Sequence, residues 1–210
     1  LKLIRKYLQS GIMTGGIVSQ RIEGTPQGSP LSPLLSNIVL DELDKELEKR
    51  GHKFVRYADD CNIYVRSQMA GERVMESVSN FIESKLKLLV NRDKSQVCEV
   101  FQTKFLGHTI QIDGYLTIAK QSIERFKDKV RGITKRNRGV KFEQIIAELQ
   151  PLMRGWLNYF RYARCKGLLK NLDSWIRRKL RCYRLKQCKR VITLQRFLES
   201  RGVDSWQSWI

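Results

Sequence analysis

The sequence lacks the features that mark several common classes of protein. It contains no run of about 18 apolar residues, so we expect no membrane-spanning helix. It holds two histidines and five dispersed cysteines, with no CxxC pair, and therefore lacks the closely spaced ligands of a zinc site. Scattered cysteines in odd number are typical of free thiols in a reducing compartment. These absences predict a cytoplasmic protein without membrane contact.

Acidic residues are scarce in the second half of the chain. Residues 119–210 hold 24 Lys+Arg against 7 Asp+Glu, whereas residues 1–118 hold 16 against 14, so nearly all of the net charge of +19 lies after residue 118. A solvated basic surface is one interpretation. Because so many like charges repel one another in so short a segment, we favour a polyanionic partner, a nucleic acid.

A pair of aspartates lies between two short alternating runs. The segment from Lys53 to Arg66 reads KFVRYADDCNIYVR, and each run alternates polar and apolar residues as a half-buried strand does. The spacing predicts a tight hairpin with Asp59 and Asp60 at its tip. Aspartate is common in turns, but adjacent carboxylates on a rigid turn are also suited to binding Mg²⁺ beside a substrate phosphate.

The hydrophobic period changes near residue 119, where the charge also changes. Before it, the pattern predicts an α+β layer, with helices on one face of an antiparallel sheet. After it, apolar stripes predict helices only. We therefore expect two domains, 1–118 and 119–210. The predicted helices are 1–10, 31–50 and 74–89, with later stripes at 123–133, 142–149, 152–163, 169–183 and 191–198; the predicted strands are 15–23, 53–57, 61–66, 96–100, 105–112 and 115–118.

Two further patterns bear on function. The turn Gly24–Pro30 (GTPQGSP) enters a helix N-terminus, an arrangement that suits an anionic ligand such as a triphosphate. Because many helices begin with Ser-Pro, the turn taken alone favours an ordinary helix start. The acids of the 31–50 helix, including Asp41 and Asp44, are expected on its solvated face. In the basic region, Trp156 and Trp175 lie among arginines and have the spacing of core residues, so we favour packing over base stacking for both.

Taken together, these segments resemble a known family. GTPQGSPLSPLLSNIVLDELD (24–44), YADD (57–60), LKLLVNRDKS (86–95) and FLGH (105–108) resemble consecutive blocks of reverse transcriptases. LMRGWLNYFRYA (152–163) resembles the thumb, or maturase, region of group II intron-encoded proteins. The blocks occur in the family's order and span almost the whole chain.

The resemblance implies a right-hand polymerase, with a palm followed by an all-α thumb, that copies RNA into DNA with Mg²⁺ and deoxynucleoside triphosphates. It implies that Asp59 and Asp60 are the catalytic, metal-binding pair, with Asp59 favoured as the direct ligand. Gln27, Gly28 and Lys94 match positions beside the incoming nucleotide. Phe105, Leu106 and Gly107 match the loop that steadies the primer terminus.

In the predicted thumb, the i, i+4 pair Ile176 and Leu180 should face the core, so Arg177, Arg178 and Arg181 should point outward and bind nucleic acid. The implied partners are intron RNA during splicing and an RNA template with a DNA primer.

The chain also departs from the family pattern. No match to the block with the third palm carboxylate is present, nor to the fingers, which predicts a fragment: part of the palm plus the thumb. We expect residues 1–210 alone to bind RNA but not to catalyse DNA synthesis. The missing palm strand should leave an apolar surface exposed, and we expect the missing N-terminal part, a second copy of the chain or bound RNA to cover it. Two alternatives remain: a polymerase-dead RNA-binding splicing factor, and a reverse transcriptase of a retron or phage-defence system.

Overall fold

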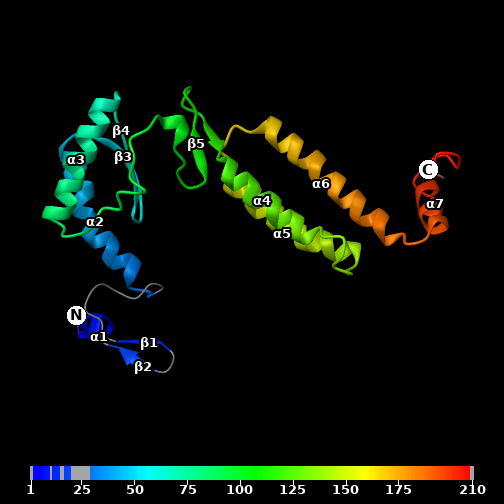
Figure 1. The fold of residues 1–210 in the computed structure, drawn as a ribbon, viewed down its shortest axis with the longest axis horizontal. Coiled ribbons are helices and arrows are strands. Elements are labelled where there is room, and N and C mark those ends of the chain that lie inside the picture. Colours follow the sequence, from blue (N-terminus) through cyan, green and yellow to red (C-terminus); the bar gives the residue numbers. More distant parts are fainter. Residues whose placement is uncertain (1, 10, 15–16, 20–28, 209–210) are drawn as a thin grey trace. The chain divides into compact units, whose positions relative to one another are not determined.

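The computed structural model describes residues 2–9, 11–14, 17–19 and 29–208 (Figure 1). The chain divides into two compact units, residues 1–98 and 99–210. The first contains α1 (Lys2–Gln9), β1 (Ile12–Thr14), β2 (Ile17–Ser19), α2 (Ser32–Lys49), β3 (Lys53–Tyr57), β4 (Asp60–Tyr64) and α3 (Gln68–Ser84). The second contains the 3-10 helix η1 (Val100–Gln102), β5 (His108–Ile110), β6 (Leu116–Ile118), α4 (Lys120–Ile133), α5 (Phe142–Tyr159), α6 (Lys166–Gln187) and α7 (Val191–Glu199).

Helices α2 and α3 cover one face of the β3–β4 hairpin. Leu43 and Leu47 of α2 and Val78 of α3 are buried, and Phe54 and Ile63 of the hairpin pack against them. Inward and outward residues alternate along β3, as expected for a strand with one covered face. The structure fits the predicted α+β class, although the described strands form three separate antiparallel hairpins and not one sheet.

Residues 85–100 differ from the prediction. Helix α3 ends at Ser84 and does not continue to Leu89, which is 96% exposed; Lys87 takes a left-handed φ of 56°, which a helix cannot accommodate. The predicted strand 96–100 is absent as well. Val97 instead packs on α3, where a Cβ added to the buried Gly71 would lie 2.5 Å from the Val97 Cγ1. This segment is therefore held by side-chain packing and has no strand partner in the described part of the chain.

The second unit is built on a core of three helices. Phe126 and Val130 of α4 pack with buried residues of α5 and α6, and Figure 1 shows α4 and α5 side by side. The buried partners are Ile145, Leu149, Leu172, Ile176 and Tyr183.

Helix α5 is continuous through Pro151, whereas the sequence stripes predicted a break there. A proline removes one helical hydrogen bond. In α5 the apolar stripe continues on both sides of it, through Leu149, Leu152 and Trp156, which all contact the core.

The β5–β6 hairpin is attached to these helices. The backbone N–H of Ala119 donates to the Gly107 carbonyl (2.9 Å), and that of Arg164 donates to the Leu116 carbonyl (2.8 Å). The Arg164 guanidinium also lies 3.4 Å from the centroid of the Tyr115 ring. The boundary between the two units falls after residue 98 of the chain, whereas the change in charge falls at residue 119. The palm and thumb assignment, 1–118 and 119–210, stays a prediction.

Candidate active site and nucleic-acid interface

The two adjacent aspartates lie at the tip of the β3–β4 hairpin. Tyr57 pairs with Asp60, so the connecting loop is only two residues long, Ala58 and Asp59. Asp59 lies in the turn, Asp60 begins β4, and both are exposed. The structure therefore places both carboxylates where the alternating pattern predicted them, while their chemical role stays a prediction.

One arginine joins this tip to helix α2. The Arg56 Nε and Nη2 donate to the two carboxylate oxygens of Asp44, at 2.7 and 2.5 Å. Its Nη1 donates to the Asn37 Oδ1 at 3.1 Å and to the carbonyl oxygen of Ala58 at 2.8 Å. The Arg56 side chain is only 13% exposed, and the hydrogen bonds to Asp44 raise its pKa above the ordinary value.

The Arg56 network corrects the prediction for Asp44. We expected its carboxylate on the solvated face of the helix, but its side chain is only 25% exposed and it forms a bidentate ion pair. Asp41 is exposed, as expected, and pairs with Lys45 at 2.6 Å. Cys61, the strand neighbour of Arg56, is affected too: burial, with the nearby Asp44 charge, raises the pKa of its thiol to about 11. The sequence contained one signal that Arg56 points inward. It lies two residues after Phe54 on the same strand, and residues two apart share a face.

The donor atoms at the hairpin tip can be compared with those that a metal ion needs. Within the described residues, no group of three or more His, Cys, Asp or Glu side chains is placed to hold an ion. Mg²⁺ is nevertheless commonly bound by one or two carboxylates, with water and substrate phosphates completing its shell. Asp59 and Asp60 fit that donor set, because both are exposed oxygen ligands on a short, braced turn.

The predicted nucleotide-binding residues are placed only in part. Gln27 and Gly28 lie outside the described residues. Lys94 is exposed in a polar turn, where its backbone N–H lies 3.3 Å from the carbonyl oxygen and 3.2 Å from the Oδ1 of Asn91. The turn presents the Lys94 side chain to solvent, and its contact with a triphosphate stays a prediction.

The predicted primer loop is a second tight turn. Phe105 and His108 exchange backbone hydrogen bonds, each 2.9 Å, around Leu106 and Gly107. Both loop residues have positive φ, 50° and 76°, as in the type I′ turns that suit a twisted hairpin. Leu106 is 41% exposed at this tip.

Groups from α4 and α5 hold this turn. The Tyr159 hydroxyl donates to the Leu106 carbonyl at 3.0 Å, and the His108 Nδ1 lies 3.0 Å from the same oxygen. The Ser122 hydroxyl donates to the Gly107 carbonyl at 3.2 Å. The Phe160 ring packs on His108, with centroids 4.9 Å apart. The turn is thus fixed by residues far away in sequence, which the sequence alone did not reveal.

The α6 arginines lie on the side that was predicted. Ile176 is buried and Leu180 is partly buried against the core, while Arg177, Arg178 and Arg181 are exposed. The Arg177 Nε donates to the Asp173 carboxylate at 2.8 Å, so part of its charge is offset. A surface of this kind is suited to binding phosphates.

The two tryptophans contribute to the core, as we favoured. Trp156 stacks on Phe126 with a centroid separation of 4.5 Å, and both Trp156 and Trp175 pack against the buried cluster. The Arg131 guanidinium and the Lys179 ammonium each lie 5.7 Å from the Trp175 ring centroid. The basic side chains therefore cover this ring.

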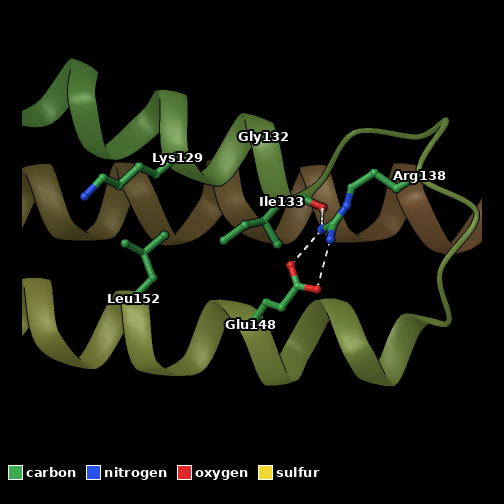
Figure 2. Close-up of a pocket in the computed structure, with 6 residues that line it drawn as sticks. All are labelled: Lys129, Gly132, Ile133, Arg138, Glu148 and Leu152. Carbon is green, nitrogen blue, oxygen red and sulfur yellow. Dashed lines mark hydrogen bonds and ion pairs between the residues drawn. The ribbon is translucent and has the colours of Figure 1, made fainter. Parts of the chain in front are cut away.

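A hollow of about 390 Å³ lies between α4 and α5, and none of the predicted site residues lines it (Figure 2). Arg138 spans one side of it: its guanidinium donates to both Glu148 carboxylate oxygens, at 2.7 and 2.9 Å, and to the Ile133 carbonyl at 2.8 Å. The hydrogen bond with Arg138 lowers the pKa of Glu148. Because Ile133 is the last residue of α4, this arginine caps that helix.

Comparison with known proteins identifies two matched regions. Residues 2–110, just over half of the chain, match the reverse transcriptase (RNA-dependent DNA polymerase) family. Residues 123–202 match the group II intron maturase-specific domain.

Individual relatives agree with these matches. The chain is similar to protein YkfC of Escherichia coli (strain K12), with 29% identity over 145 residues, 52% of this chain and 38% of YkfC. It is similar to the group II intron-encoded protein LtrA of Lactococcus lactis subsp. cremoris, with 26% identity over 176 residues, 53% of this chain and 29% of LtrA. A shorter match, 36% identical over 75 residues, joins 34% of the chain to 17% of the retron Mx65 reverse transcriptase of Myxococcus xanthus. The chain thus spans about a third of the lengths of YkfC and LtrA.

These matches follow the order of the two units: a hairpin with paired aspartates in the first, and a basic three-helix core in the second. No helix in the described ranges has both the length and the apolar character needed to cross a membrane. The chain belongs to the reverse transcriptase family, and it carries a group II intron maturase-specific domain over residues 123–202.

Proposed function

We propose that this chain forms the catalytic hairpin and the nucleic-acid-binding thumb of an RNA-directed DNA polymerase of a mobile group II intron. The observation that carries the proposal is the occurrence, in one chain, of adjacent exposed carboxylates on a two-residue turn and a maturase-specific domain. The substrates would be an RNA template, a DNA primer and deoxynucleoside triphosphates. The same basic helices would bind the intron RNA during splicing, and we propose a cytoplasmic location for this work.

Asp59 and Asp60 would hold Mg²⁺ at the hairpin tip. When bound there, the metal would offset the charge that develops on the phosphoryl oxygens during nucleotide transfer. The short turn limits how far the two carboxylates can move, which is a form of preorganisation. Lys94 would offset charge on the leaving pyrophosphate, and Gln27 and Gly28 would lie beside the incoming nucleotide.

The turn Phe105–Gly107 would contact the primer end. Its tip presents Leu106 to solvent, while Tyr159 and Ser122 hold its carbonyl groups from the other side. The exposed arginines Arg177 and Arg181 would meet the phosphates of the duplex or of the intron RNA. Binding of the nucleic acid and the chemical step would therefore reside in different units of the chain.

Changes at the hairpin tip test this separation. In a full-length enzyme that contains this chain, Asp59→Asn and Asp60→Asn should each reduce primer extension at least about a hundredfold, because a metal contributes several kcal/mol to such a transfer. RNA affinity in filter binding should remain near the wild-type value. Asp113→Asn, in the β5–β6 turn, is the matched control. Primer extension near the wild-type rate for Asp59→Asn would refute the proposed role.

The chain by itself provides a second test. Because the described residues place no third carboxylate at the site, residues 1–210 alone should bind RNA but extend no primer, and adding the N-terminal part of a longer reverse transcriptase that contains this chain should restore synthesis. Alternatively, two copies of this chain would form a homodimer and bind RNA together. Synthesis by residues 1–210 without any supplement would mean that an acidic residue has been misassigned.

The match to a retron reverse transcriptase supports a second candidate function. The two candidates differ in their RNA partner. A preference for group II intron RNA over retron RNA in a competition assay supports the intron enzyme, and the reverse preference supports the retron enzyme. The maturase-specific domain favours the intron partner.

A further inference from the structure

Arg56 contacts the peptide group that leads into Asp59. Its Nη1 donates to the Ala58 carbonyl at 2.8 Å. That carbonyl belongs to the planar peptide unit that also contains the nitrogen and Cα of Asp59. Holding the direction of the carbonyl therefore holds the Asp59 Cα and, through it, the direction in which the carboxylate leaves the turn.

The backbone at Ala58 makes this contact important. Ala58 has a φ of 54°, a left-handed conformation that non-glycine residues seldom adopt unless the surroundings enforce it. The Arg56 donor is such an enforcing group. The turn that presents Asp59 would otherwise have several conformations available to it.

Arg56 itself is firmly anchored. Both oxygens of Asp44 accept from it in the bidentate geometry that only a guanidinium provides, and Asn37 accepts a further bond. Asp44 and Asn37 lie on α2, which packs on the core. Through Arg56, the turn is therefore held by this helix as well as by its own two strands. Arg50 offers a contrast. It follows the last residue of α2, bonds to Glu46 of α2 and Ser77 of α3, and contacts no turn residue among the described hydrogen bonds.

We propose that Arg56 is the positioning residue of the acidic hairpin: anchored on Asp44, it fixes the Ala58–Asp59 peptide and so sets the direction of the Asp59 carboxylate. The inference rests on the proposed function, because the carboxylate is positioned for metal-dependent nucleotide transfer. It goes beyond that function by assigning a role to a residue that the proposed function leaves without one.

Arg56→Lys is the decisive variant. A lysine keeps the charge but lacks the fork that reaches two carboxylate oxygens and a carbonyl together. In residues 1–210 without metal, hydrogen exchange of the amides at 58–61 should accelerate about tenfold, the loss of one charge-assisted hydrogen bond, while amides in α2 and α3 keep their rates. Asp44→Asn should reproduce the effect, because it removes the charge on which Arg56 is anchored.

The activity readout uses the full-length enzyme. Arg56→Lys should lower kcat of primer extension between about tenfold and a hundredfold, as expected for a misplaced catalytic group. The KM for deoxynucleotide and the affinity for template–primer should stay within about twofold. Arg50→Lys is the ion-pair control and should change neither exchange at the tip nor kcat.

A core truncation separates positioning from stability. Val74→Ala removes a contact from the same core and should lower the melting temperature without the local exchange effect. If Val74→Ala, at equal loss of stability, lowers kcat as much as Arg56→Lys does, or if Arg56→Lys leaves exchange at 58–61 unchanged, the positioning role is wrong. A wild-type full-length enzyme that extends no primer refutes the proposed function instead, and the exchange experiment still decides the role of Arg56 in the turn.

Discussion

The Tyr159 hydroxyl donates a hydrogen bond to the carbonyl oxygen of Leu106, 3.0 Å away and 53 positions earlier in the sequence. Tyr159 ends helix α5, and Leu106 forms the tip of the turn before β5. The bond thus joins the maturase-specific domain to the last block of the polymerase match. Geometry at the proposed primer loop is therefore set by a residue that the family boundary assigns to the other region.

Removing this hydroxyl tests how much the turn depends on it. Tyr159→Phe should destabilise the second unit by about 1 kcal/mol, the net worth of one hydrogen bond, because the carbonyl keeps only its His108 contact. Thermal unfolding measures the loss. Tyr162→Phe, at a side chain that is 72% exposed, is the control and should cost less than about 0.5 kcal/mol. Equal losses in the two variants would contradict the role of Tyr159.

Gly107 and Gly114 form a matched pair for substitution. Both have positive φ, 76° and 78°, but a Cβ at Gly107 would lie 2.9 Å from the Ser122 Oγ and 3.3 Å from the Phe160 Cζ, whereas at Gly114 it would meet nothing within 4 Å. Gly114→Ala should cost about 1–2 kcal/mol from backbone strain alone. Gly107→Ala should cost at least about 1 kcal/mol more, from crowding. Equal free energies of unfolding would show that the turn moves freely away from α4 and α5.

The ion pair of Arg138 and Glu148 predicts a pH dependence. Because the hydrogen bond with Arg138 lowers the pKa of Glu148 in the folded state, the pair stabilises the fold above the carboxyl's ordinary pKa. This stability is lost as the pH falls through the lowered value. Glu148→Gln should therefore lower the melting temperature at neutral pH, and the difference from wild type should vanish in strong acid.

A double variant checks that the two residues act together. Arg138→Gln combined with Glu148→Gln should lose no more stability than Arg138→Gln alone, since Arg138→Gln already removes both the ion pair and the hydrogen bond to the Ile133 carbonyl. A difference between Glu148→Gln and wild type that grows as the pH falls would contradict the assigned sign.

If the α6 arginines contact phosphates, the salt dependence of RNA affinity should depend on them. Changing Arg177, Arg178 and Arg181 to Ala should flatten the log–log dependence of RNA affinity on salt concentration by about 2–3 units, roughly one for each lost phosphate contact. Asp173→Asn should act in the opposite direction, because it releases Arg177 from its carboxylate. An unchanged slope would mean that these arginines form a solvated face.

The control for the salt experiment removes the same number of charges from the first unit. Lys45, Lys49 and Arg73 are exposed there, and changing all three to Ala should leave the slope near the wild-type value. A slope that flattens equally in both triple variants would indicate binding through net charge alone and not through the α6 surface.

Periodicity was a good guide wherever a helix packs a single face. The pattern predicted a helix at 31–50, and α2 covers Ser32–Lys49; the stripe around Ile176 likewise lies in α6. It was wrong beyond Ser84, because Leu86 continues the apolar spacing while the backbone turns away at Lys87. It also separated α5 into two parts at Pro151, since packing on both sides of a proline is not visible in a local pattern.

The site was predictable to the same extent. Asp59 and Asp60 were located at the tip because two alternating runs flank them. The partner of Asp44 was not predictable, because a helix position beside Leu43 gives no indication that an arginine twelve residues away reaches it. Contacts such as that of Tyr159 with Leu106 depend on how separate elements meet, and local sequence carries no signal of that.

Helix α5 connects two contacts that lie at its opposite ends. It is about 27 Å long, from 18 residues at 1.5 Å each. At its C-terminal end, Tyr159 donates a hydrogen bond to the proposed primer loop. At its N-terminal end, the Phe142 ring contacts the guanidinium of Arg184, which also contacts Phe197 of α7. Pro151 has no N–H to give the Ala147 carbonyl, so the rod is weakest near its middle. Any bending of α5 is therefore expected near Pro151, between the contact that Tyr159 makes and the contact that Phe142 makes.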